Sequence, residues 1–189
     1  MRPIVAVGVV SVVLLALVAG AALAQPAVFC TPGVPCNGTP QGEDIFGSPE
    51  ADTIHAMGGN DDVHGNAGND TMNGGPGDDV IEGYEGKDTI NAGKDNDSYL
   101  AGYENSDKVY GEEGNDTIDL AQNDVATPDD PAPPEDVGFG GDGNDTILAN
   151  DGNKDTIHCD KGNDTVTFDA GKDTVVKRKT DRCEMKHPM

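Results

Sequence analysis

The chain has 189 residues, of which 35 are acidic and 12 are basic, so its formal net charge at neutral pH is −23. Only 35% of the residues are hydrophobic and Trp is absent, which excludes a large aromatic core. This much charge with so few aromatic residues is typical of disordered acidic chains, unless the carboxylates are spaced to bind cations.

Residues 1–24 are predicted to be a signal peptide. Arg2 precedes an apolar run over residues 4–19, and the small-residue segment Ala22-Leu23-Ala24 follows it. Positive, apolar and small-residue regions in this order are typical of a secretory signal, so we expect a secreted, extracellular protein. A membrane anchor is the alternative, because the apolar run is long.

Residues 25–41 are predicted to be a short N-terminal lead, which carries Cys30 and Cys36. Behind a signal peptide, an even number of cysteines argues for disulfides. The four cysteines of the chain allow three pairings, of which we favour Cys30 with Cys36 and Cys159 with Cys183. A metal site at the cysteines is disfavoured, because no CxxC spacing occurs.

Residues 42–119 form a first repeat block. Its clearest part is residues 65–91, which read GNAGNDTMN, GGPGDDVIE and GYEGKDTIN. When the places of each unit are numbered from first to ninth, glycine fills the first and fourth, Asp the sixth and an apolar residue the eighth. A period of nine fits a tight glycine turn followed by a short strand, and two such units close one coil of a solenoid.

The same register extends through most of the chain, because every candidate sixth-place Asp is followed two places later by an apolar residue. The predicted sixth-place residues are Asp44, Asp52, Asp61, Asp70, Asp79, Asp88, Asp97, Asp107, Asp116, Asp145, Asp155, Asp164 and Asp173. The predicted eighth-place residues are Phe46, Ile54, Val63, Met72, Ile81, Ile90, Tyr99, Val109, Ile118, Ile147, Ile157, Val166 and Val175. We expect the eighth places to point inward as a narrow core, and the seventh and ninth to point outward.

Residues 120–139 are predicted to be an acidic, proline-rich loop, because the segment ATPDDPAPPED cannot continue a strand. A partner-binding or protease-sensitive segment is the alternative. Residues 140–176 form a second repeat block, which opens with GGDGNDTIL. Residues 177–189 are rich in Lys and Arg and are predicted to cap the last coil, with attraction to an anionic surface as the alternative.

The pattern GGxGxDxUx, where U is apolar, resembles the hemolysin-type (RTX) calcium-binding nonapeptide repeats over residues 42–176. The resemblance implies an all-β fold, a right-handed parallel β-roll (β-solenoid) with two units per coil, whose stacked turns hold multiple Ca²⁺ ions. It also implies that turn carbonyls and sixth-place carboxylates are the ligands. The implied metal ligands are Asp61, Asp70, Asp79, Asp88, Asp97, Asp107, Asp116, Asp145, Asp155, Asp164 and Asp173.

The chemistry of calcium agrees with these residues. Ca²⁺ takes about six to eight oxygen ligands in a tolerant geometry, and one turn with its carbonyl row and one Asp supplies about half of them. A stacked turn supplies the rest. We expect the turn before Asp52 to bind poorly, because Glu50 fills the fourth place, where access to positive φ favours glycine.

Stacking follows from two units per coil, because residues two units apart then lie on the same edge. We predict that Asp61, Asp79 and Asp97 line one edge and that Asp52, Asp70, Asp88 and Asp107 line the other. A core this narrow cannot offset the entropy of ordering the repeats, so folding is expected to depend on calcium.

The motifs of common enzymes are missing from the sequence: it has no HExxH, GxSxG, P-loop or EF-hand spacing. We predict a secreted calcium-binding repeat protein with a structural or interaction role, not an enzyme. The alternative is a cell-surface adhesion or matrix component, or an accessory of an exported enzyme or toxin. Calcium is the expected partner; nucleic acid is not expected, nor is a transmembrane segment after signal cleavage, and the sequence names no protein or surface partner.

Overall fold

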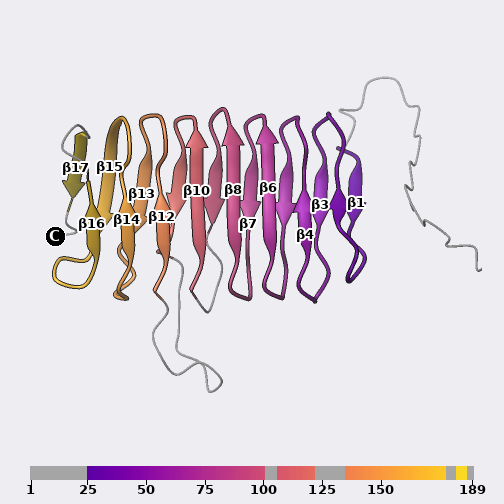
Figure 1. Ribbon diagram of the computed structural model, residues 1–189, viewed down its shortest axis with the longest axis horizontal. Helices are drawn as coiled ribbons and strands as arrows, with labels where there is room; N and C mark the ends of the chain where they lie inside the picture. The colour runs from indigo at the N-terminus through magenta and orange to yellow at the C-terminus, as the bar shows by residue number, and fades with distance from the viewer. Residues whose placement is uncertain (1–24, 101–105, 122–134, 178–181, 187–189) are drawn as a thin grey trace, which may run out of the picture.

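The computed structural model describes residues 25–100, 106–121, 135–177 and 182–186. The expected signal peptide and most of the expected proline-rich loop lie outside these residues. The described residues form an all-β parallel solenoid without a helix, in which short strands and tight turns alternate (Figure 1). Since no helix is described, none is long and apolar enough to cross a membrane within this part of the chain.

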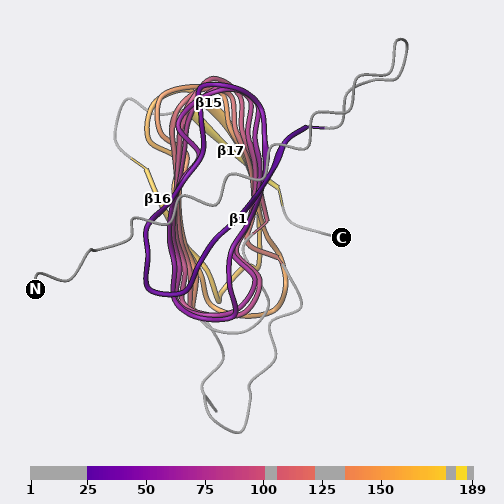
Figure 2. The same ribbon diagram turned by 90° about the vertical axis from the view of Figure 1, so that its right-hand side faces the viewer.

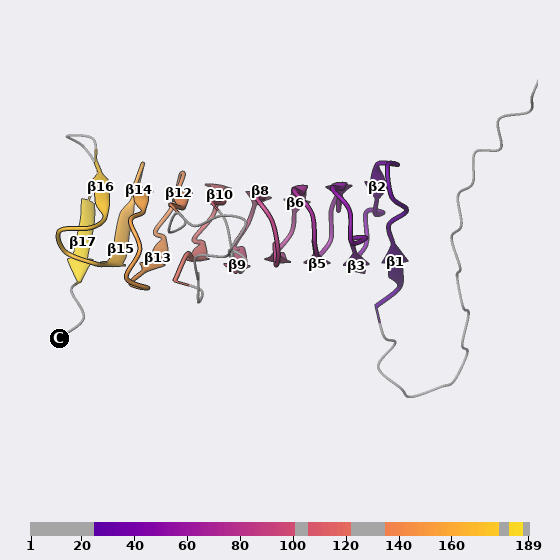
Figure 3. The same ribbon diagram turned by 90° about the horizontal axis from the view of Figure 1, so that it is seen from below.

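The strands form two parallel sheets that lie on opposite sides of the solenoid (Figure 3). In spatial order, the nine-stranded sheet contains β1 (Ala27–Phe29), β3 (Asp44–Phe46), β5 (Asp62–His64), β7 (Val80–Glu82), β9 (Ser98–Leu100), β11 (Thr117–Asp119), β13 (Thr146–Ala149), β15 (Asn163–Phe168) and β17 (Arg182–Lys186). The eight-stranded sheet contains β2 (Cys36–Asn37), β4 (Thr53–His55), β6 (Thr71–Pro76), β8 (Thr89–Lys94), β10 (Lys108–Glu113), β12 (Val137–Phe139), β14 (Thr156–His158) and β16 (Thr174–Val176).

Each coil consists of two repeat units, as the sequence predicts. Consecutive strands alternate between the sheets, so every strand pairs with the strand two units away. Met72 of β6, for example, lies opposite Ile90 of β8. Seen along the axis, the coils superimpose as one narrow loop, with little space between the sheets (Figure 2).

The core is a column of side chains from the eighth and first places. The eighth-place residues Met72, Ile81 and Ile90 have no exposed surface, as predicted. The first place also points inward, which the sequence analysis did not predict: Ala56 and Ala92 are equally buried. Glycine at first places such as Gly65, Gly74 and Gly83 keeps this column thin.

The first repeat unit is shifted by one residue from the prediction. Glu43, not Asp44, fills the buried sixth place, and Ile45, not Phe46, fills the eighth. Searching for an apolar residue two places after the sixth-place acid could not distinguish the two registers. Ile45 follows Glu43 by two places just as Phe46 follows Asp44. Strict nine-residue spacing from Asp52 favours Glu43, which is the register the structure has.

A further unit lies where only a loop was predicted. Asp136 fills a buried sixth place and β12 continues the eight-stranded sheet, so the solenoid resumes before residue 140. The search for an apolar eighth-place residue missed this unit because its eighth place is Gly138. Leu120, in the first place, fills the missing volume: a Cβ on Gly138 would lie 3.0 Å from Leu120 Cδ1.

Disulfides lie at both ends of the solenoid, and both favoured pairings are confirmed. Cys30 is bonded to Cys36 within the first coil, so the expected lead contributes strands β1 and β2. Cys159 is bonded to Cys183 of β17, the last strand of its sheet. The basic tail thus supplies the final strand of the solenoid.

Candidate metal centre

The sixth-place side chains form two columns, one along each edge of the solenoid. Edge A carries Glu43, Asp61, Asp79, Asp97, Asp116, Asp145 and Asp164. Edge B, the lower edge in Figure 1, carries Asp52, Asp70, Asp88, Asp107, Asp136, Asp155 and Asp173. The predicted division of the aspartates between two edges is confirmed, and all but Asp173 are at most 5% exposed.

Except in Glu43 and Asp52, which begin the two columns, one oxygen of each carboxylate accepts a hydrogen bond from the neighbouring coil. The N–H of Asp61 donates to Asp79 Oδ1 at 2.9 Å, and the N–H of Asp79 donates to Asp97 Oδ1 at 2.8 Å. The same bond repeats along both columns. Because an Asp side chain is just long enough to reach the backbone of the adjacent turn, these bonds hold the carboxylates in a fixed orientation.

The other oxygen is buried and, in much of the solenoid, accepts no hydrogen bond. This holds for Oδ2 of the following aspartates: Asp61, Asp70, Asp79, Asp88, Asp116 and Asp145. A buried carboxylate oxygen without a donor is costly, and a cation is the usual way to satisfy it. The carboxylates therefore fit a calcium site.

Glycines leave space for these oxygens and allow the turns to stack closely. A Cβ on Gly74, in the first place, would lie 2.4 Å from Asp79 Oδ2. A Cβ on Gly77, in the fourth place, would lie 1.8 Å from the carbonyl oxygen of Gly59 in the adjacent turn, and Gly77 has φ of +138°. The predicted need for glycine at the fourth place is confirmed here, for both conformation and close approach.

Positive φ also occurs at the second place, which the sequence analysis missed. The second-place residues with positive φ are Met57, Asn66, Gly75, Tyr84, Gly93, Glu112, Gly141 and Asp160. Non-glycine residues rarely adopt this conformation and do so at a cost, so the turns hold local strain. The glycines at three of these places, Gly75, Gly93 and Gly141, were the only feature of the sequence that indicates positive φ at the second place.

Side chains alone do not complete a metal site. Within the described ranges, no three His, Cys, Asp or Glu side chains lie close enough together to hold an ion. Each turn contributes one buried sixth-place carboxylate, so backbone carbonyl oxygens of the turns would have to supply further ligands. An oxygen-only shell of this kind suits Ca²⁺ and does not suit metals that prefer imidazole or thiolate.

Burial changes the proton affinity of these carboxylates when no metal is bound. The pKa of Asp70 and of Asp79 is raised to about 7, mainly by desolvation; backbone hydrogen bonds lower it and neighbouring carboxylates raise it. The pKa of Asp61 and of Asp88 is raised to about 6 for the same first cause. Near neutral pH the carboxyl groups of Asp70 and Asp79 are therefore partly protonated when no metal is bound, and a cation would have to displace that proton.

These shifts predict opposite pH effects with and without calcium. An unfolded Asp has a pKa of about 3.9, so between about pH 4 and 7 the folded metal-free coils bind more protons than the unfolded chain, and their stability falls as the pH rises. Calcium needs the ionised carboxylate, so its affinity rises over the same window. We expect circular dichroism in chelator to show more strand at about pH 5 than at pH 8, and the calcium midpoint to decrease from pH 5 to pH 8. Equal pH dependence in both conditions would contradict the assignment.

The comparisons with known sequences agree with this geometry. The family model of the RTX calcium-binding nonapeptide repeat matches residues 37–72, 64–99, 99–124, 135–153 and 139–175, which together cover more than half of the chain. No curated protein sequence matches the chain as a relative. On the family match and the stacked turns, the chain belongs to the RTX calcium-binding nonapeptide repeat family.

Proposed function

We propose that the protein is a secreted calcium-binding repeat protein whose β-roll folds on binding several calcium ions and serves a structural or interaction role. The observation that carries the proposal is the series of buried, unpaired Oδ2 atoms in stacked turns. Membership of the RTX family supports calcium as the ion. The two disulfides support an oxidising compartment, as expected for an exported protein.

Dependence on calcium follows from the crowding of like charges. The carboxylate of Asp79 is destabilised by those of Asp61 and Asp78, and Asp97 by Asp116, while the aliphatic column between the sheets is narrow. Without cations, ionising the columns opposes closure of the coils. Calcium bound to folded turns and not to the unfolded chain stabilises the fold by mass action.

The proposed role is non-catalytic. The carboxylates are enclosed within the turns, and several of the outward ninth places carry stacked rings. Phe46 and His64 stack with centroids 4.9 Å apart, and Phe139 and His158 with centroids 4.3 Å apart. Such regular, rigid faces suit a scaffold or a binding surface.

The proposal is tested by following strand content during metal titration of the disulfide-bonded chain. We expect a largely unfolded circular dichroism spectrum in chelator and a cooperative gain of strand signal with calcium. Magnesium should have little effect, because it requires a small octahedral site and dehydrates reluctantly. Identical spectra in chelator and in calcium would refute the proposal.

A further inference from the structure

The nine-residue turns that the structure describes are of two kinds. Eleven units are nine residues long and fully described, and they begin at residues 38, 47, 56, 65, 74, 83, 92, 111, 140, 159 and 168. Eight of them have positive φ at the second place. In the other three, which begin at residues 38, 47 and 168, the second place does not have positive φ, and its N–H donates to the sixth-place carboxylate of the same unit.

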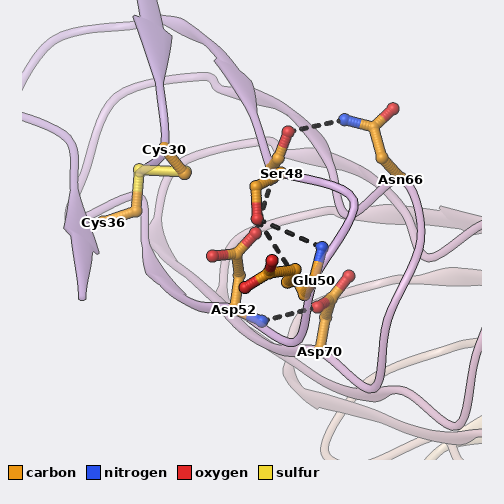
Figure 4. Close-up of a disulfide and its surroundings, with 8 residues drawn as sticks. Cys30, Cys36, Ser48, Glu50, Asp52, Asn66 and Asp70 are labelled. Carbon is orange, nitrogen blue, oxygen red and sulfur yellow. Dashed lines mark hydrogen bonds between the residues drawn. A yellow bond between two sulfur atoms is a disulfide. The ribbon is translucent and has the colours of Figure 1, made fainter. Parts of the chain in front are cut away.

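We call the first kind open turns and the second kind closed turns. In the closed turns, the N–H of Thr39 donates to Glu43 Oε2 at 3.0 Å, that of Ser48 to Asp52 Oδ2 at 2.6 Å, and that of Asp169 to Asp173 Oδ2 at 2.6 Å. Figure 4 shows the turn of Ser48, in which the Ser48 hydroxyl also accepts the N–H of Glu50 at 3.2 Å.

The sign of φ at the second place decides which peptide group faces the carboxylate. A change of sign accompanies a flip of the peptide that joins the first and second places, and this exchanges its N–H for its carbonyl oxygen. In a closed turn the N–H faces the carboxylate and occupies it. In the open turns of Asp70 and Asp79 the N–H does not bond the carboxylate, and the Oδ2 atom accepts no hydrogen bond. A carbonyl and a carboxylate that face the same space require a cation, whereas an inward N–H repels one.

The closed turns lie where the carboxylate columns end. Edge A begins at Glu43, edge B begins at Asp52, and edge B finishes at Asp173. At the remaining end, Cys183 lies opposite Asp164 and so takes the sixth place, where it is bonded to Cys159. Each end of each column is thus closed by the chain's own N–H or by a disulfide.

Position in the stack explains this arrangement. An ion between two turns receives half of its ligands from each, so a terminal turn, with a neighbour on one side only, offers an incomplete shell on its outer side. Asp173 has both oxygens occupied, since Oδ1 also accepts the N–H of Asp155 at 3.1 Å. Asp52 keeps a buried Oδ1 without a hydrogen bond, but the N–H of Ser48 places positive partial charge beside it.

We propose that the ends of both carboxylate columns are metal-free caps, and that calcium enters only between open turns. This inference rests on the proposed function and deepens it. By this inference Asp173 is not a calcium ligand, although the resemblance implies that it is. Asp52, whose turn was expected to bind calcium poorly, does not bind it at all. The caps hold the terminal turns closed when calcium is absent, so the ends of the solenoid do not depend on the ion that folds its middle.

Two substitutions on edge B compare a closed turn with an open one. Asp52→Asn and Asp88→Asn each remove one buried charge of the same column. We expect Asp88→Asn to lower the number of ions counted by native mass spectrometry and to raise the calcium midpoint at least about tenfold, because even indirect partners of a metal ligand change affinity by about 10–100-fold. Asp52→Asn should leave the ion count unchanged. A loss of ions in Asp52→Asn equal to that in Asp88→Asn would overturn the inference.

A gain-of-function variant tests the same point without depending on a loss of stability. The double substitution Ser48→Gly and Glu50→Gly turns GSPEADTIH into GGPGADTIH, which has the turn sequence of residues 74–77. With glycine at the second and fourth places the turn can open, and we expect it to bind an additional ion. An unchanged ion count in this variant, with strand content equal to the wild type, would overturn the inference. If the wild type itself binds no calcium, the proposed function fails instead, so the two failures are distinct.

Discussion

Asp79→Asn is expected to shift the calcium midpoint of folding upward by at least about tenfold. Asp79 lies between Asp61 and Asp97 on edge A, and its buried Oδ2 accepts no hydrogen bond. The amide keeps the size of the side chain and its oxygen can still accept the N–H of Asp61, so the substitution removes mainly the anionic ligand. In the proposed arrangement stacked turns share ions, so both sites next to Asp79 should weaken. Loss of an outer partner of a metal ligand lowers metal affinity by about 10–100-fold, and loss of the ligand itself should lower it at least as much.

The control for this substitution is the adjacent residue. Asp78→Asn removes the same formal charge from the fifth place, which is exposed, and the corresponding residues on edge A include Asn60 and Asn96. Asp78 Oδ1 accepts the N–H of Asn96 at 2.9 Å, a bond that an amide oxygen can also accept. We expect its calcium midpoint to remain close to that of the wild type. Equal shifts in the two variants would mean that calcium responds to bulk charge and not to stacked turns.

Gly77→Ala is expected to destabilise the calcium-bound fold by roughly 2–5 kcal/mol. A side chain at positive φ costs about 1–2 kcal/mol, and forcing a methyl group into a packed site costs about 1–3 kcal/mol more. The collision here is with backbone, because the new Cβ would lie 1.8 Å from the carbonyl oxygen of Gly59 and no side-chain rotation can relieve it. The loss is a large fraction of the total stability of a typical domain, about 5–15 kcal/mol, and urea unfolding at saturating calcium measures it.

Gly171→Ala separates the two costs. Gly171 also fills a fourth place and has φ of +89°, but a Cβ there would meet nothing within 4 Å. This variant should lose only about 1–2 kcal/mol, from conformation alone. If both variants lose the same stability, the close approach of stacked turns is not what requires glycine at Gly77.

The repeat pattern predicted the architecture because one apolar residue in every nine, at the eighth place, fixes the register of a thin core. Met72 and Ile81 are buried as predicted, and Asp61 and Asp79 stack on one edge as predicted. The pattern failed where an inward position lacked an apolar residue. Gly138 made the unit of Asp136 invisible, since the compensating side chain, Leu120, lies before an insertion.

The two kinds of turn could not be predicted from the sixth and eighth places, because open and closed turns share them. Asp52 and Asp70 are each followed by Thr and an apolar residue, yet only Asp52 accepts an N–H from its own turn. Glu50, at the fourth place, indicates that the unit of Asp52 differs from the others. The unit of Asp173 has Gly171 at its fourth place and therefore looks like an open turn in sequence, although the orientation of a single peptide makes it closed.

The claim that stacked sixth-place carboxylates bind calcium is tested most directly by counting ions on the folded chain. Native mass spectrometry of the disulfide-bonded protein, with strand content measured at the same calcium concentration, would compare the wild type with Asp79→Asn and Asp78→Asn. We expect several ions on the wild type, the same number on Asp78→Asn and fewer on Asp79→Asn. A folded wild type without bound ions, or an equal count in all three proteins, would contradict the claim.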